Sequence, residues 1–148
     1  MKIKKKIGKF IHIAAIGSAT ASLSFIGIIP PASAATSTYP SCSKGGFSGT
    51  IRIDYEKIST GRARIFEVSY RINKGSNRGG NNANVYYTDN GTLPVTRFNT
   101  SSGIQDNQWN YLGGVYTTST SNGIAIKFIF DKSNASDPSC STYIYLPI

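Results

Sequence analysis

Asp54 and Glu56 are the two residues of this sequence whose spacing best suits acid–base chemistry. They alternate with apolar residues in a strand-like segment, so both project from one face, about 6.6 Å apart along the backbone. Glycosidases use two carboxylates at separations in that general range. Arg62 and Arg64, however, follow on the other side of an expected hairpin, where they would form ordinary cross-strand ion pairs with these acids. We therefore expect a charged strand face here and no catalytic residue.

Nucleophiles and metal ligands are few. The chain has one histidine, His12, and two cysteines, Cys42 and Cys140. His12 lies in an N-terminal segment that we expect to be cleaved, and an even pair of cysteines in an exported chain predicts one disulfide, Cys42–Cys140. The mature chain then lacks the residues of Ser-His-Asp and Cys-His sites and of the usual zinc and copper sites. We expect no enzyme activity, no bound cofactor and no metal site.

Aromatic and basic side chains are the most abundant groups in this sequence that suit molecular recognition. Nine tyrosines and one tryptophan occur after residue 35, and neighbouring tyrosines on a strand must place some rings at the surface, where they suit sugars or proteins. Five basic residues concentrate between positions 62 and 78, which suits an anionic partner unless the run is only a solvated face. The candidate binding residues are Arg62, Arg64, Arg71, Lys74, Arg78, Tyr86, Tyr87, Tyr143 and Tyr145.

Short β-strands joined by turns must carry these side chains, because no window after residue 34 has a helical period of apolar residues. The parity of charged and apolar residues reverses inside one run, which predicts a β-bulge near Ile65 and Phe66. Trp109 shares its parity with Tyr111 and Val115, and we expect it in the core. The expected strands are 47–56, 62–72, 85–87, 94–98, 109–116, 123–131 and 140–146.

About seven short strands with frequent turn signals predict an all-β fold. We expect a single antiparallel β-sandwich of immunoglobulin-like architecture, or a partly closed barrel. The two cysteines lie near the ends of the strand series, so the disulfide would tie the segment before the first strand to the last strand. The central cysteine–tryptophan–cysteine spacing of true immunoglobulin domains is absent, so only the architecture is predicted.

Polar segments separate the expected strands. Residues 73–82 contain three glycines and four asparagines without apolar anchors, and we expect them to form the most mobile internal loop. Residues 89–91 and 100–108 are expected to be a turn and a polar loop. Calcium binding at the aspartates of such segments is an open alternative, although the EF-hand spacing is absent.

The first 34 residues have the pattern of a secretory signal. Five lysines precede an apolar run, which ends at Pro30 and is followed by Ala32-Ser33-Ala34, the small-residue pattern of a cleavage site. A permanent membrane anchor is the alternative, because the run is almost long enough to span a bilayer. We expect cleavage after residue 34 and a single secreted domain over 35–148. That domain keeps 11 basic and 7 acidic residues, a net charge of +4 instead of +9.

These features favour a small secreted binding protein without enzyme activity, acting as a monomer. Its ligand would be an extracellular polymer or a protein partner. The alternative is a toxin or antimicrobial protein acting on membranes, but no basic amphipathic helix follows residue 34, so membrane contact is not favoured. A carboxylate-based hydrolase and a protease inhibitor are further alternatives. Export and the lack of a nucleic-acid motif argue against nucleic acid as a partner.

Overall fold

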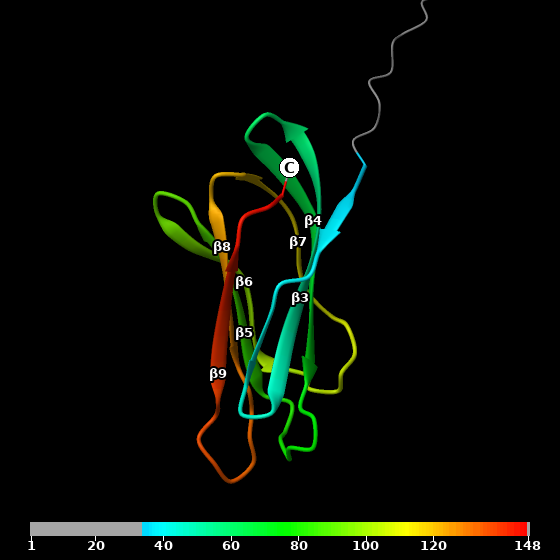
Figure 1. The fold of residues 1–148 in the computed structure, drawn as a ribbon, viewed down its shortest axis with the longest axis vertical. Helices are drawn as coiled ribbons and strands as arrows, with labels where there is room; N and C mark the ends of the chain where they lie inside the picture. Colours follow the sequence, from blue (N-terminus) through cyan, green and yellow to red (C-terminus); the bar gives the residue numbers. More distant parts are fainter. Residues whose placement is uncertain (1–33, 148) are drawn as a thin grey trace, which may run out of the picture. The chain divides into compact units, whose positions relative to one another are not determined.

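The computed structural model describes residues 34–147, which form nine β-strands (Figure 1). The expected export signal lies outside the described residues except for Ala34. Within residues 34–147 no helix is long and apolar enough to cross a membrane. The strands are β1 (Thr36–Thr38), β2 (Ser41–Lys44), β3 (Phe47–Ser59), β4 (Arg62–Asn73), β5 (Ala83–Asn90), β6 (Pro94–Gly103), β7 (Asn110–Ser119), β8 (Gly123–Ile129) and β9 (Ser139–Ile144).

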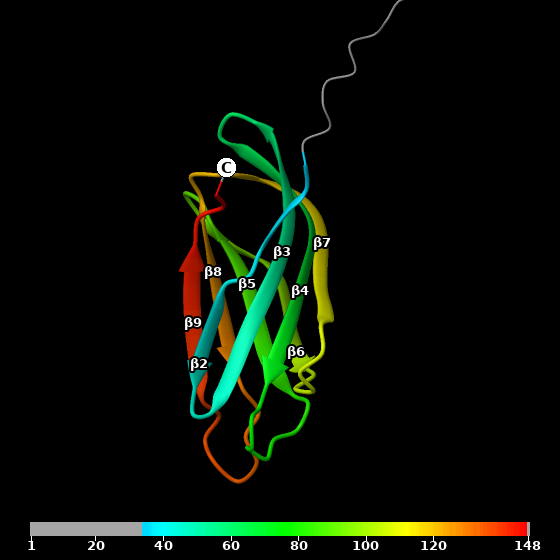
Figure 2. The same ribbon diagram turned by 45° about the vertical axis from the view of Figure 1, so that its right-hand side comes forward.

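The strands form two antiparallel sheets that face each other. Sheet A has the order β1-β3-β4-β7, and β2 pairs with β3 beyond the end of β1. Sheet B has the order β6-β5-β8-β9. Figure 2 shows β3, β4 and β7 in one layer and β5, β8 and β9 in the other. The sheets do not close on each other, so the predicted all-β fold is confirmed in its sandwich form.

Strict alternation of side chains builds the core between the sheets. Along β3, Ile51, Ile53 and Tyr55 are buried while the residues between them remain half-exposed. β5 and β8 present the same pattern from the opposite sheet, because side chains on a strand point alternately to its two faces. The buried side chains include Phe47, Ile65, Val68, Tyr70, Ile72, Val85, Tyr87, Ile124, Ile126, Phe128 and Phe130.

A β-bulge at Phe66 confirms the break in parity predicted near Ile65 and Phe66. Asp54 of β3 pairs with Glu67, whereas the next residue, Tyr55, pairs with Ile65. Phe66 is therefore the extra residue of β4. Because the bulge absorbs one residue, both halves of the strand keep their apolar residues in the core and their charged residues on the outer face of sheet A.

The Cys42–Cys140 disulfide is present, as predicted. Its S–S bond is 2.05 Å long and joins residues 98 positions apart. Cys42 lies on β2 at one edge of sheet A, and Cys140 lies on β9 at the edge of sheet B. The bond therefore links the two layers covalently on one side of the sandwich.

Several expected boundaries are wrong. The strands β1 and β2 are rich in serine and threonine and lack apolar alternation, so they escaped detection. Residues 89 and 90, expected in a turn, belong to β5, and β6 continues through Gly103 into the expected polar loop. Both extensions are ladder pairings between the two strands, with Asn90 opposite Pro94 and Ala83 opposite Gly103. Backbone pairing of this kind leaves no trace in the polarity of the residues.

Candidate binding surfaces

The outer face of sheet A carries exposed aromatic rings, which we call the aromatic surface: Tyr39, Trp109 and Tyr111. Their exposed fractions are 55%, 37% and 69%. The ring centroids of Tyr39 and Trp109 are 6.1 Å apart. Trp109 directly precedes β7 and Tyr111 lies two residues further along, so both project from the same face of one edge strand. Large rings left in water are typical of contact surfaces.

The expectation that Trp109 lies in the core is wrong. Trp109, Tyr111 and Val115 are all exposed. Tyr111 pairs with Ser69, whereas Gly113 pairs with the buried Val68, so Leu112 is an extra residue of β7 and the parity reverses there. The inner side of β7 holds Gly113, and the Phe98 ring from sheet B occupies the space that a side chain at this position would need. The core beside Gly113 is therefore filled by the opposite sheet, whereas Tyr116 further along β7 packs into the interior.

Arg71 of β4 joins the aromatic surface. Its guanidinium carbon lies 4.8 Å from the centroid of the Trp109 ring, a cation–π contact. No carboxylate within residues 34–147 forms a salt bridge with Arg71. The cation is therefore positioned by an aromatic ring and is not paired with a described acid.

Tyr111 lies along the strand instead of standing away from it. A Cβ atom added to Gly114 would be 2.7 Å from the Tyr111 hydroxyl oxygen, so the ring reaches over this glycine. Because Gly114 has no side chain, the Tyr111 ring lies close to the backbone of β7.

An ionic network beside the aromatic surface holds its acids in place. Arg52 contacts Asp54 at 2.6 Å and Glu67 at 3.4 Å, and the hydroxyls of Ser37 and Ser69 donate to these carboxylates. Partial burial opposes ionisation of Asp54, but the hydrogen bonds from Arg52 and Ser37 outweigh it and lower the pKa of Asp54 below its usual value. A carboxylate held ionised in this way is a poor general acid.

The predicted cross-strand placement is confirmed for Glu56, which is the ladder partner of Arg64, although no salt bridge joins the two side chains. The predicted ion pairs of Asp54 with Arg62 or Arg64 are wrong. The bulge at Phe66 places Glu67 opposite Asp54, and the ionic partner of Asp54 is Arg52 on the same strand. Arg64 instead extends over the Phe66 ring, with its guanidinium carbon 5.5 Å from the ring centroid. The register of β3 against β4 beyond Tyr55 depends on the extra residue Phe66, whose position the sequence indicates only approximately.

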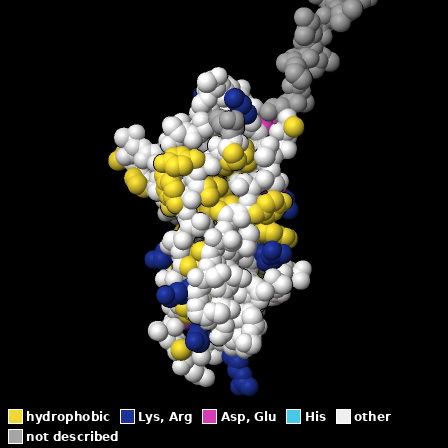
Figure 3. All heavy atoms as spheres, viewed as in Figure 1, with side chains coloured by type: hydrophobic (Ala, Val, Ile, Leu, Met, Phe, Trp, Pro, Cys, Tyr) yellow, Lys and Arg dark blue, Asp and Glu magenta, His cyan; other side chains and the backbone are white. Residues whose placement is uncertain are grey.

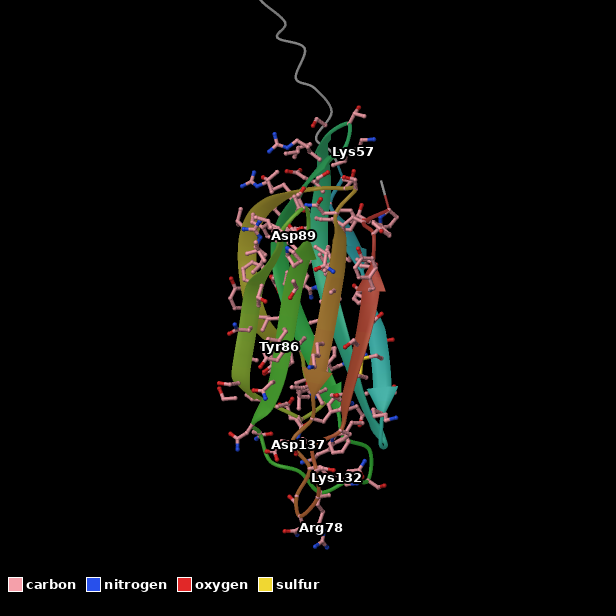
Figure 4. All side chains as sticks on the ribbon, turned by 90° about the vertical axis from the view of Figure 1, so that its left-hand side faces the viewer. Lys57, Arg78, Tyr86, Asp89, Lys132 and Asp137 are labelled. Carbon is pink, nitrogen blue, oxygen red and sulfur yellow. A yellow bond between two sulfur atoms is a disulfide. The ribbon has the colours of Figure 1, made fainter. Side chains whose placement is uncertain are left out.

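The five basic candidates do not form one patch. Arg62 pairs with Ser59 at the β3–β4 hairpin, near Lys57, whereas Arg78 lies at the opposite end of the sandwich (Figure 4). A strand of 12 residues spans about 40 Å at the usual rise per residue, which sets the distance between the two groups. The Lys74 ammonium donates to the Gly79 carbonyl and thus stays within its own loop. Arg71 alone among the five reaches the aromatic surface.

Tyr87 is withdrawn as a binding residue because it is completely buried. Its hydroxyl accepts a hydrogen bond of 3.0 Å from the Tyr116 hydroxyl, and its ring contacts Phe98. Burial raises the pKa of Tyr87 well above its ordinary value and that of Tyr116 to about 12. Both phenols are therefore part of the interior of the sandwich.

The other candidate tyrosines lie on sheet B. Tyr86 is half-buried on the outer face of β5, where Figure 4 shows it near the middle of the sheet. Tyr143 and Tyr145 are exposed at the end of β9, with ring centroids 5.4 Å apart. Figure 3 shows hydrophobic side chains gathered where β9 leads into the C-terminal segment. These rings are on the opposite face of the protein from Trp109.

A shallow groove crosses the outer face of sheet B beside Tyr86. Its volume is about 400 Å³, within the range of small-molecule sites. Lys127 supplies the only charge in its lining, and the rest is hydroxyl-bearing or aliphatic. The lining residues are Tyr86, Thr88, Thr96, Ala125, Ile126, Lys127, Ile129 and Ser141. This groove lies on the sheet opposite the aromatic surface.

The loop 74–82 has polar anchors that its composition did not reveal. The buried Gln105 side chain donates to the carbonyl oxygens of Gly80 (2.9 Å) and Asp131 (2.8 Å). Ser133 donates through its backbone N–H to the Arg78 carbonyl. These bonds join the loop to neighbouring segments. The greater mobility expected for residues 73–82 stays a prediction.

No family model, curated protein or solved structure matches this chain. Within residues 34–147 no three of the His, Cys, Asp and Glu residues gather closely enough to hold a metal ion. Sequence reasoning missed Tyr39, Trp109 and Tyr111 as surface residues. The signal that indicates them is Gly113, because it leaves one inner position of β7 without a side chain.

Proposed function

We propose that this protein is a secreted binding module without enzyme activity, which holds an extracellular polymer on the aromatic surface. The observation that carries the proposal is the exposure of three large rings beside Arg71. Arg71 forms no salt bridge with an acid of the described residues. Exposed aromatic rings offer flat amphipathic contact area, and arginine adds directional hydrogen bonds.

The position of these residues favours recognition over chance exposure. Trp109 directly precedes the hydrogen-bonded strand β7, and Tyr111 lies within it. Arg71 lies on the neighbouring strand β4. Side chains on paired strands are ordered before a ligand arrives, which reduces the entropy lost on binding. The Cys42–Cys140 disulfide supports an oxidising extracellular compartment for the same protein.

The rival functions receive less support. A hydrolase centred on Asp54 and Glu56 would need an acid that donates a proton, whereas Asp54 is held ionised by Arg52. A membrane-active protein would need its cations and apolar groups together, whereas the basic residues of 62–78 are distributed along the whole length of β4 and its following loop.

The test compares two matched double variants in co-sedimentation with insoluble extracellular polysaccharides and wall material. Trp109→Ala with Tyr111→Ala removes the rings of sheet A, and Tyr143→Ala with Tyr145→Ala removes two exposed rings of sheet B. We expect the first variant to lose most of the bound fraction and the second to bind like the unaltered protein. Circular dichroism and thermal unfolding of both variants check that the sandwich is intact.

The reverse result would move the site to sheet B and its groove. If the unaltered protein sediments with none of the polymers, the proposed function is wrong. A normal bound fraction for both double variants would also contradict it, because binding would then not depend on exposed rings.

A further inference from the structure

The guanidinium of Arg71 is the feature of the aromatic surface that indicates the charge of its ligand. Its guanidinium carbon lies over the Trp109 ring, 4.8 Å from the centroid, and the group forms no salt bridge with any acid of residues 34–147. A cation–π contact of this kind does not use all five N–H donors of the guanidinium and leaves some at its edge. This edge matches the two oxygens of a carboxylate, and such charge-assisted pairs are stronger than neutral hydrogen bonds.

The neighbouring acids do not compete for this position. Asp54 and Glu67 turn toward Arg52 and accept further hydrogen bonds from Ser37 and Ser69. Their charges are therefore partly compensated within the ionic network. A negative group approaching Arg71 meets a free cation on one side and paired acids on the other.

The rings and the cation are arranged for a repeating ligand. Trp109 and Tyr111 are two residues apart on one side of the chain, so they are about 7 Å apart along the strand. Ser69 is the ladder partner of Tyr111, so Arg71, two residues further along β4, is level with Trp109. A ligand lying along β7 would thus meet two flat rings in a row and a cation at its side.

A polysaccharide suits this arrangement better than a protein surface. Sugar rings present apolar C–H faces to aromatic rings and hydroxyl groups at their edges. A protein partner commonly covers about 800 Å² with an apolar centre. Here the ionic network of Arg52, Asp54 and Glu67 lies next to the rings, so the apolar area is a narrow row.

We infer that the polymer is an acidic polysaccharide, whose sugar rings stack on Trp109 and Tyr111 and whose carboxylates bind Arg71. The inference rests on the proposed function and adds the chemical class of the ligand. Arg71 is then the residue that distinguishes acidic from neutral polymers, whereas the rings supply affinity for both.

Fluorescence of Trp109 tests the inference directly, because it is the only tryptophan in the chain. The probes are polygalacturonate, alginate and hyaluronate, each compared with its own methyl-esterified form, which has the same backbone without the charge. We expect at least one acidic polymer to change the emission and to bind about tenfold more tightly than its ester, as for one charge-assisted hydrogen-bonded pair. Added salt should reduce this preference.

Two charge-removing variants assign the preference to a residue. Arg71→Met keeps an extended side chain on Trp109 but removes the cation, and we expect it to bind the acidic polymer only as tightly as the ester. Lys127→Met removes the same charge from the groove of sheet B, and we expect it to behave like the unaltered protein. Arg71→Lys keeps the charge without the planar fork and should fall between these two. Equal thermal unfolding of the variants checks that each is folded.

The outcomes separate the inference from the proposed function. If a polymer and its ester bind equally well and Arg71→Met changes neither affinity, the acidic class is wrong while polymer binding on the aromatic surface stands. If Lys127→Met abolishes the preference, the carboxylate binds in the groove and the assignment to Arg71 is wrong. If none of the six polymers binds, the acidic class is wrong, and the co-sedimentation test decides the proposed function separately. If anionic phospholipid vesicles are bound in their place, both proposals fail.

Discussion

The buried carboxylate of Asp89 is the single polar group whose removal should cost this sandwich most. Asp89 is 3% exposed and accepts hydrogen bonds from the Thr118 hydroxyl (2.8 Å) and the Asn122 amide (3.0 Å). Arg97 lies 3.7 Å from the same carboxylate. Because Thr118 is on β7 and Asp89 on β5, this group connects the two sheets on the side opposite the disulfide.

The expected cost follows from these contacts. A hydrogen bond to a charged group contributes roughly 1.5–3 kcal/mol, and a buried partner left without it is costly. Thr118 is buried and would keep only the longer hydrogen bond of its hydroxyl to the Ser119 carbonyl (3.3 Å), whereas Asn122 is half-exposed and can bind water instead. Arg97 is exposed, so its ion pair adds at most about 0.5 kcal/mol after screening. We expect Asp89→Ala to lower the free energy of unfolding by about 3 kcal/mol.

Urea unfolding of a double-mutant cycle isolates the contact between the sheets. The cycle uses Asp89→Ala, Thr118→Val and the double variant, and we expect a coupling energy of about 1.5 kcal/mol. Glu56→Ala is the control, because the Glu56 carboxylate accepts no side-chain hydrogen bond from residues 34–147 and should change stability by less than about 0.5 kcal/mol. A coupling within about 0.3 kcal/mol of zero would refute the assignment of Asp89 as a link between the sheets.

Three further predictions concern the rest of the fold. The unfolded chain ionises its tyrosines near pH 10, whereas burial raises the pKa of Tyr116 to about 12 and that of Tyr87 well above its ordinary value. The unfolded state therefore binds fewer protons, and the free energy of unfolding should fall as pH rises above about 10. Urea titrations of Tyr116→Phe should show a weaker dependence of this free energy on pH. A pH dependence equal to that of the unaltered protein would contradict the prediction. Replacing both bridged cysteines by serine should lower stability by about 4–5 kcal/mol, because the bond closes a loop of 98 residues; a loss below about 1 kcal/mol in the same assay would contradict this. Gln105→Ala should speed amide exchange in loop 74–82 and leave the β3 amides unchanged in mass spectrometry; equal protection in both proteins would show that Gln105 does not anchor the loop.

The alternation along β3 and β4 made much of the fold predictable. Apolar residues at every second position define which face of a strand is buried, and the reversal near Phe66 is local enough to be seen as a bulge. The disulfide was predictable for a simpler reason, because two cysteines in an oxidising compartment have one possible pairing. Both features depend on residue type and order alone.

The aromatic surface was harder to predict. The alternation at Trp109, Tyr111 and Val115 has the same form as that of a core-facing strand, and it indicated the wrong face. What distinguishes the two cases is Phe98 from sheet B, which packs against Gly113 and fills the core there. The position of Phe98 depends on how the two sheets face each other, which no local pattern contains.

The sequence by itself determined the strand class of the chain, the bulge in β4, the covalent link between Cys42 and Cys140 and the supply of rings and guanidinium groups. Only the tertiary structure decided which of those groups act together. It buried Tyr87, separated Arg62 from Arg78, and brought Arg71 to Trp109 from a different strand. The physical reason is that alternation specifies two faces for each strand, whereas the pairing and packing of strands far apart in the chain decide which face meets the core and which side chains become neighbours.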